Sequence, residues 1–361
     1  MSYNSDVMAK LAQEHFQVFV ENQYGAPGTD ALQKVLATAR AIFHIRTPES
    51  FAVGLLVTAR VDGSATDDAD FVPADGVHEI QALSDAVLVE VRAEGIFARP
   101  RRPGDLSTDI AVDCVVYEFA PRGEAFREAI VLPDREVDLL NPNGYPSSLA
   151  APTFWELEDA LNHYHHNLAR NGTCKILKTA WADDGEQRRL AFVNHPEKIM
   201  RSSLAQHLRS SLRDLKVVRV NEEQNQSETE PVDIEVSWGF TTHIALLEIK
   251  WLGKCLKSSG DELAAYTYSD ARAREGVPQL EGYIDDAHER NPGYEIRGYL
   301  VVFDGRRKGV QKWLPGEVSA ADAWHYKDRE IDYGAIPDRN DFRVPVRLYL
   351  EPKVGRPALS A

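Results

Sequence analysis

The sequence is poor in the features that mark several protein classes. Its three cysteines, Cys114, Cys174 and Cys255, lie far apart without a C-x-x-C pair, so neither a disulfide framework nor a zinc site is expected. No run of about 18 apolar residues occurs, so no membrane span is expected. The N-terminus lacks the basic stretch and apolar core of a secretory signal. P-loop, G-x-S-x-G and dinucleotide-binding motifs are also absent. We therefore expect a cytoplasmic protein without a membrane partner.

The chain is acidic, but unevenly so. Its 361 residues include 41 Lys or Arg and 56 Asp or Glu, which gives a net charge of −15 at pH 7. Residues 1–150 hold 12 basic and 23 acidic residues, a net charge of −11, which leaves 29 basic and 33 acidic residues, or −4, for the remainder. An acidic surface repels phosphate at long range, so the N-terminal part is not expected to bind nucleic acid through its net charge. Local basic patches remain compatible with the C-terminal part.

The composition divides the chain into two predicted domains. Residues 139–153 are rich in Pro, Asn, Gly and Ser and form the best candidate boundary. Residues 1–150 are predicted to be an α+β domain, with two helical patterns separated by the breaker run "YGAPGT" and then several strand-like segments. The domain at 151–361 is predicted to begin with a helix that ends at Gly172, followed by two short strands at 174–181 and 188–193.

The segment "NHPEKIMRSSLAQHLRSSL" predicts a second helix in this domain. Asn194 with Glu197 three residues later resembles a capping box. Leucines at four-residue spacing give the helix one apolar stripe: Leu204, Leu208 and Leu212. Three arginines are expected at its surface: Arg201, Arg209 and Arg213.

The stretch "PVDIEVSWGFTTHIALLEIKW" (231–251) predicts a β-hairpin with charged residues in core-like strands. In the first strand Asp233, Glu235 and Ser237 share one face, and in the second Glu248 and Lys250 share a face. If "GFTT" is a four-residue hairpin loop, Asp233 lies directly opposite Glu248, and their Cβ atoms are ~5 Å apart.

Facing carboxylates in an apolar setting predict a cation site. Two acids this close repel each other and are costly to bury, whereas Mg²⁺ takes oxygen ligands from one or two carboxylates. The backbone carbonyl of Ile249 offers a further oxygen, and Lys250 would point at the same space. The simpler alternative is that Glu248 and Lys250 only form an ion pair.

The order of these features resembles the PD-(D/E)XK nuclease superfamily over roughly residues 190–305. An Asp lies in one strand and Glu-x-Lys in the next, and a helix and a buried strand follow. The resemblance implies an α/β fold, in which a restriction-endonuclease-like mixed sheet flanked by helices has its core at about 190–310. It also implies that Asp233 and Glu248 hold Mg²⁺, with Mn²⁺ as the alternative, and that Lys250 assists the attacking water. One departure is that Pro231 stands two residues before the Asp rather than beside it.

Two further residues match the superfamily pattern. Glu197 matches an acid in the preceding helix, although helix capping alone would explain it. Gln279 and Tyr283 match polar residues of the following helix, although they also fit an ordinary helix face. A basic run, Arg306, Arg307 and Lys308, is either a phosphate contact or a solvated turn.

The resemblance implies a metal-dependent endonuclease that hydrolyses phosphodiester bonds of DNA, with RNA as the alternative substrate. It favours a role in restriction or anti-phage defence. The N-terminal domain would then be an accessory domain for recognition or regulation, and would bind a partner protein or a second copy of the chain. The alternative is a non-catalytic nucleic-acid-binding or protein-binding module that retains the nuclease fold.

Overall fold

The protein is described by a computed structural model with two compact units. The described residues are 5–51, 53–74, 86–122, 125–139, 147–183, 188–212, 218–224, 231–239, 241–259, 262–264, 267–310 and 318–354. Unit 1 comprises residues 1–155, 240–243 and 293–295, and unit 2 comprises residues 156–239, 244–292 and 296–361. Both units are built on a mixed sheet with helices against it, so the predicted α/β class is confirmed.

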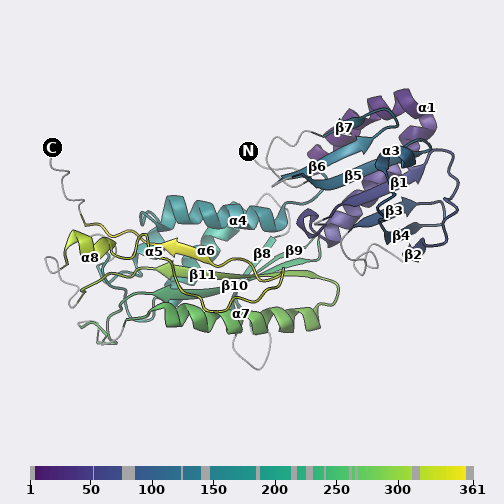
Figure 1. Cartoon of the computed structure of the whole chain (residues 1–361). Helices are drawn as coiled ribbons and strands as arrows, with labels where there is room; N and C mark the ends of the chain where they lie inside the picture. Colours follow the sequence, from purple (N-terminus) through teal and green to yellow (C-terminus); the bar gives the residue numbers. More distant parts are fainter. Residues whose placement is uncertain are drawn as a thin grey trace, which may run out of the picture. The chain divides into compact units, whose positions relative to one another are not determined.

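Unit 1 is a seven-stranded sheet with one long helix against it (Figure 1). The two helical patterns of the sequence form the two halves of α1 (Ser5–Ile45), and the chain breaks at Gly25, whose φ of 68° suits glycine. The strands lie in the order β2-β4-β3-β1-β5-β6-β7, in which β1 is parallel to β3 and antiparallel to β5. The elements after α1 are η1 (Pro48–Ser50), β1 (Leu55–Arg60), β2 (Val72–Ala74), β3 (Val87–Val91), β4 (Ile96–Pro100), α3 (Ser107–Ile110), β5 (Cys114–Arg122), β6 (Ala125–Val131) and β7 (Glu136–Asp138).

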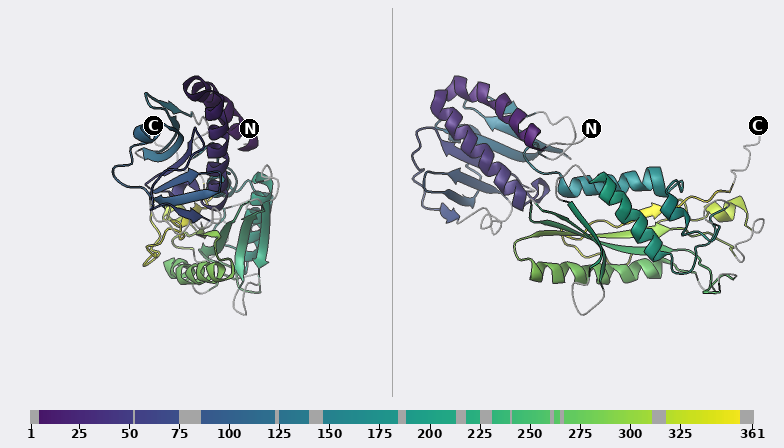
Figure 2. Two further views of the ribbon diagram at one scale, coloured as in Figure 1. Left: turned by 90° about the vertical axis from the view of Figure 1, so that its right-hand side faces the viewer. Right: turned by 180° about the vertical axis from the view of Figure 1, so that it is seen from behind.

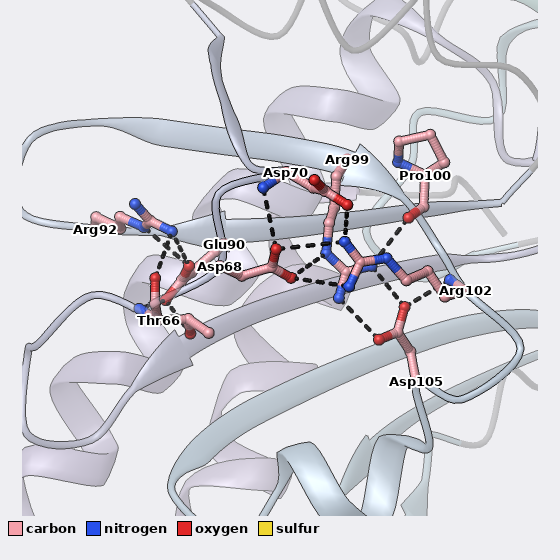
Figure 3. A network of polar contacts seen from close by, with 9 residues as sticks. All are labelled: Thr66, Asp68, Asp70, Glu90, Arg92, Arg99, Pro100, Arg102 and Asp105. Atoms are coloured by element: carbon pink, nitrogen blue, oxygen red, sulfur yellow. Dashed lines mark hydrogen bonds and ion pairs between the residues drawn. The ribbon is translucent and has the colours of Figure 1, made fainter.

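The charged residues near β2, β3 and β4 pair with one another (Figure 3). Arg99 is buried and bridges Asp68 at 3.0 Å and Asp105 at 2.6 Å. Glu90 accepts hydrogen bonds from Arg92 and from the backbone N–H of Thr66. These contacts fasten an irregular segment to the sheet, and they account for the local charge without a ligand.

Unit 2 has a five-stranded sheet in the order β12-β11-β10-β9-β8. From residue 195 to 305 the elements follow the predicted order of helix, three strands, helix and strand. Their bounds are α4 (Thr153–His163), η2 (Tyr164–Ala169), α5 (Lys175–Lys178), α6 (Glu197–Ser211), β8 (Val218–Gln224), β9 (Val232–Trp238), β10 (His243–Leu252), α7 (Asp270–Arg290), β11 (Glu295–Asp304), α8 (Ala320–Trp324) and β12 (Val346–Tyr349).

The prediction of two short strands at 174–181 and 188–193 is wrong. Residues 175–178 form the helical turn α5, and only an isolated bridge joins Trp181 to Phe192. The rings of these two residues stack with their centroids 4.2 Å apart. Aromatic packing and two backbone hydrogen bonds, from Ala182 to Ala191 and from Val193 to Ala180, therefore hold the segment.

Helices cover both faces of the unit 2 sheet. Figures 1 and 2 show α7 on one face and α4 with α6 on the other. Every residue of β10 is buried. Along β10 and β11 the even-numbered positions, such as Leu246 and Leu300, pack with α7, whereas Tyr299 donates a hydrogen bond to Glu158 of α4. Charged residues in these strands are thus enclosed by protein and need partners.

None of the helices in the described part of the chain has the length and apolarity to cross a membrane.

Candidate functional site

The predicted register of the β9–β10 hairpin is confirmed. The paired residues run from Ile244 opposite Ser237 to Leu247 opposite Ile234, which is the predicted register, and Asp233 and Glu248 are the next residues of the two strands. Phe240 of the loop lies outside the described residues. Beyond the last of these pairs, the backbone N–H of Ile249 donates to Oδ2 of Asp233 at 2.8 Å. The Asp233 side chain therefore binds the backbone of the strand that carries the other site residues.

Three charged side chains are buried near the end of the hairpin that lies away from its loop. Asp233 is 6% exposed, and Glu248 and Lys250 are each 2% exposed. The Lys250 ammonium contacts Oε1 of Glu248 and donates to Oε1 of Gln279 at 2.8 Å. The structure thus brings together Asp233, Glu248, Lys250 and Gln279, four of the residues that the sequence places in the site.

A chain of hydrogen bonds fixes the lysine. Gln279 Nε2 donates to the Tyr283 hydroxyl at 2.8 Å, and that hydroxyl donates to the carbonyl of Pro231 at 3.4 Å. Gln279 and Tyr283 are four residues apart on α7 and share one helix face. Because Pro231 directly precedes β9, these contacts link Lys250 to the strand that carries Asp233.

A glycine on α7 leaves room for the lysine stem. A Cβ at Gly276 would lie 2.7 Å from Cδ1 of Leu300 and 3.0 Å from Cγ of Lys250. Both distances are too short for a carbon contact without movement of a neighbour. The close approach of α7 to β10 at this point therefore depends on the absence of a side chain.

The expectation that Arg201 lies at the surface is wrong. Arg201 is 8% exposed, and its Nη1 donates to Oδ1 of Asp233 at 2.9 Å. It follows Glu197 by one helical turn on α6, so both side chains lie on one face of that helix. A buried carboxylate needs a cation or hydrogen-bond donors, and Arg201 supplies both to Asp233.

The predicted capping box at Asn194 and Glu197 is also wrong. Helix α6 begins at Glu197 with Pro196 at its N-cap and no side-chain cap, while Asn194 donates to Ser258. The Glu197 carboxylate instead contacts Arg272 of α7 at 3.4 Å. A tertiary ion pair therefore replaces the local cap.

The pKa of Glu248 reports on the electrostatics of this cluster. Burial raises it, the nearby charges of Asp233 and Glu197 raise it further, and Lys250 opposes them, so the pKa of the Glu248 carboxyl reaches about 8. The Glu248 carboxyl group therefore gains or loses its proton near pH 8 and not near pH 4.5. Such a shift, caused by burial and a second carboxylate, is typical of functional sites.

The oxygen ligands that these residues offer are of the type that binds a hard divalent cation. Asp233 and Glu248 offer carboxylate oxygens, and Mg²⁺ or Mn²⁺ would relieve the repulsion that raises the pKa of Glu248. The predicted third ligand is the backbone carbonyl of Ile249. The backbone N–H of the same residue donates a hydrogen bond to Asp233. Among the described residues, no group of three or more His, Cys, Asp or Glu side chains is placed to share a metal ion.

A basic cavity of about 800 Å³ is lined by Arg201, the partner of Asp233, whereas Asp233, Glu248 and Lys250 are not among its lining residues. Glu197 and Arg201 both line it, together with Trp251 and Tyr268. Its other charged lining residues are all basic: Lys198, Lys257 and Arg272. A cavity that is basic in an acidic chain favours an anionic ligand. Sequence reasoning missed Arg201 and Arg272, and the only signal for Arg201 was its spacing of one turn from Glu197.

The basic run 306–308 lines a second cavity, of about 560 Å³, but two of its residues are buried. Arg306 donates to both carboxylate oxygens of Asp304 at 2.9 Å, and Arg307 donates to the carbonyl of Arg306 at 2.8 Å. Lys308 alone among the three is exposed. Arg306 and Arg307 thus hold the end of β11, which explains them without a phosphate.

No protein-family model matches the chain, no curated protein resembles its sequence significantly, and no solved structure resembles its fold significantly.

Proposed function

We propose that the chain is a metal-dependent nuclease that hydrolyses phosphodiester bonds of DNA. The observation that carries the proposal is the buried set of Asp233, Glu248 and Lys250 on neighbouring strands, which Arg201 connects to a basic cavity. Facing carboxylates suit a divalent cation, a lysine beside them suits water activation, and a basic cavity suits a phosphate backbone.

The fold of unit 2 supports the same proposal. A helix, three strands, a helix and a further strand follow one another, and the acids lie on the two antiparallel strands β9 and β10. This order is the one that the PD-(D/E)XK resemblance implies for a restriction-endonuclease-like core. Because a fold alone does not establish an activity, the proposal depends on the site.

Each residue has a role in the proposed reaction. Bound Mg²⁺ would activate water and neutralise charge on the phosphate. Asp233 and Glu248 would hold the cation. Lys250, oriented by Glu248 and Gln279, would orient the nucleophile and stabilise charge on the scissile phosphate. The basic residues of the cavity would hold neighbouring backbone phosphates.

One observation favours the alternative of a non-catalytic binding module. Asp233 pairs with Arg201, and Glu248 pairs with Lys250, so each buried acid already has a cation from the chain itself. Such a cluster is electrically satisfied without metal. The basic cavity would then bind nucleic acid without cleaving it.

A cleavage assay separates the two. Linear, circular and single-stranded DNA and RNA are incubated with the full chain in Mg²⁺, in Mn²⁺ or in EDTA. We expect cleavage of DNA that EDTA abolishes and that Lys250→Met and Asp233→Asn each lower by about 10²-fold or more. Lys175→Met is the matched control, because Lys175 is an exposed lysine of the same unit. Cleavage that survives both site substitutions would contradict the assignment, and binding without cleavage would favour the alternative.

A further inference from the structure

Arg201 stands between an acid of the site and the basic cavity. Its guanidinium donates to Oδ1 of Asp233 at 2.9 Å, and the same residue lines the cavity of about 800 Å³. Oδ2 of Asp233 already accepts the N–H of Ile249. Each carboxylate oxygen of Asp233 thus accepts one hydrogen bond from the chain, and a cation that binds at Oδ1 must share that oxygen with Arg201 or displace the guanidinium.

The charges of the site balance one another. With Glu248 ionised, as it must be to bind a cation, three acids pair with three basic side chains: Asp233 with Arg201, Glu248 with Lys250, and Glu197 with Arg272. A dication added to this neutral set would leave a surplus of positive charge among largely buried groups, which is unfavourable. Moving one guanidinium away from its carboxylate reduces that surplus at the place where the cation binds.

A phosphate in the cavity would give the displaced guanidinium a new partner. Arginine is suited to this exchange, since its planar fork binds carboxylate and phosphate oxygens with the same two-point geometry. The phosphate also supplies the negative charge that the cation-bound cluster lacks. Cation and phosphate should therefore favour each other's binding.

We propose that Arg201 is a phosphate-binding residue that pairs with Asp233 only in the absence of substrate, so that divalent cation and nucleic-acid backbone bind cooperatively. This inference rests on the proposed nuclease function. Arg201 is a positioning and binding residue in this scheme, because it sets the availability of Asp233 and holds a backbone phosphate. Coupling of this kind is reciprocal, so the cation must strengthen DNA binding by the same factor as DNA strengthens cation binding.

The test measures Mn²⁺ affinity by calorimetry or electron paramagnetic resonance, with and without a short, fully phosphorothioate-linked DNA duplex that resists hydrolysis. We expect the duplex to tighten Mn²⁺ binding to the wild-type chain by about tenfold. Arg201→Gln should bind Mn²⁺ about tenfold more tightly than wild type without DNA, and should gain little from the duplex. Arg209→Gln is the matched control on the same helix, because Arg209 pairs with Glu222 outside the site.

Two results would overturn the inference alone. The first is an Arg201→Gln variant that binds Mn²⁺ no more tightly than wild type without DNA. The second is an Arg201→Gln variant that keeps the full gain from the duplex, while the wild-type chain still cleaves DNA in Mn²⁺. A wild-type chain that binds no Mn²⁺ in either state would overturn the proposed function as well.

A second variant covers the case in which Arg201→Gln does not fold. Arg201→Lys keeps the positive charge beside Asp233 but lacks the planar guanidinium that binds phosphate at two points. Its Mn²⁺ affinity without DNA should therefore stay near the wild-type value, whereas the duplex should tighten its Mn²⁺ binding less than in wild type. An undiminished gain in a folded Arg201→Lys chain would contradict the proposal.

Discussion

Replacing Glu248 by glutamine tests the electrostatics of the site with little change of shape, because the amide resembles the protonated carboxyl group in size. In the folded chain the pKa of Glu248 is raised to about 8, by burial first and by the Asp233 charge second, against an ordinary value of 4.5. Between these pH values the folded state holds a proton that the unfolded state has released. The carboxyl group therefore couples folding to pH in this interval.

The sign and size follow from proton linkage. A raised carboxyl pKa contributes stability that is fully present below pH 4.5 and is lost as the pH rises through about 8. Each pH unit corresponds to about 1.4 kcal/mol, so the whole interval corresponds to at most about 5 kcal/mol. Glutamine does not titrate. The free energy of unfolding of Glu248→Gln should therefore rise relative to wild type by about 1 kcal/mol per pH unit across this interval.

The assay is urea denaturation at a series of pH values, followed by the tryptophan fluorescence of unit 2, which contains Trp181, Trp238 and Trp251. Glu222→Gln is a control of opposite sign. Burial raises the pKa of Glu222, but hydrogen bonds from Arg209 and Ser202 outweigh it, so the pKa is lowered and the stabilisation is lost as the pH falls. Parallel stability profiles for wild type and Glu248→Gln would refute the reasoning, because Glu248 would then titrate as it does in solvent.

The same experiment with Mg²⁺ tests the cation site. A divalent cation binds the ionised form of Glu248, so it should stabilise the wild-type chain more at pH 8 than at pH 6. Glu248→Gln should lose most of this stabilisation at both pH values. Equal stabilisation of the two chains by Mg²⁺ would place the cation elsewhere.

Two glycines and one buried acid give further tests. Gly276→Ala should displace Lys250 and lower cleavage, because the new Cβ would lie 3.0 Å from Cγ of Lys250. Gly282→Ala on the same helix meets nothing within 4 Å and should raise the free energy of unfolding by about 0.5–1 kcal/mol with unchanged cleavage, and equal effects at the two positions would contradict this account. Asp304→Asn should lower the free energy of unfolding by about 3–5 kcal/mol, because Asp304 is fully buried and its carboxylate pairs with both Arg306 and Arg347. A loss below about 1 kcal/mol in urea denaturation would show that these ion pairs are not needed for stability.

The hairpin that carries the acids could be predicted from the sequence because its signals are local. Alternating residues set the faces of each strand, and the short loop set the register that pairs Ile244 with Ser237 and Leu247 with Ile234. The order of helices and strands in unit 2 follows from hydrophobic period in the same way. Gln279 and Tyr283 could also be placed, since their spacing puts both on one face of α7.

The partners of the acids could not be predicted, because they depend on tertiary contacts. Arg201 lies on a helix with several polar residues, and only the folded chain shows that it reaches Asp233, 32 residues away. Glu197 lies at a position where capping residues are common, yet its carboxylate forms an ion pair with Arg272 of α7. Local propensity is a weak guide wherever a buried charge must find its counter-ion in a distant segment.

The basic cavity within an acidic chain has a consequence for the kinetics of encounter. At low ionic strength the net charge of −15 repels nucleic acid over a long range and slows its approach. At physiological salt the screening length is about 8 Å, so this repulsion fades before contact, while close contacts inside the cavity survive. Only at higher salt are those contacts weakened in turn. The association rate should therefore pass through a maximum as salt increases, whereas a basic DNA-binding protein slows throughout.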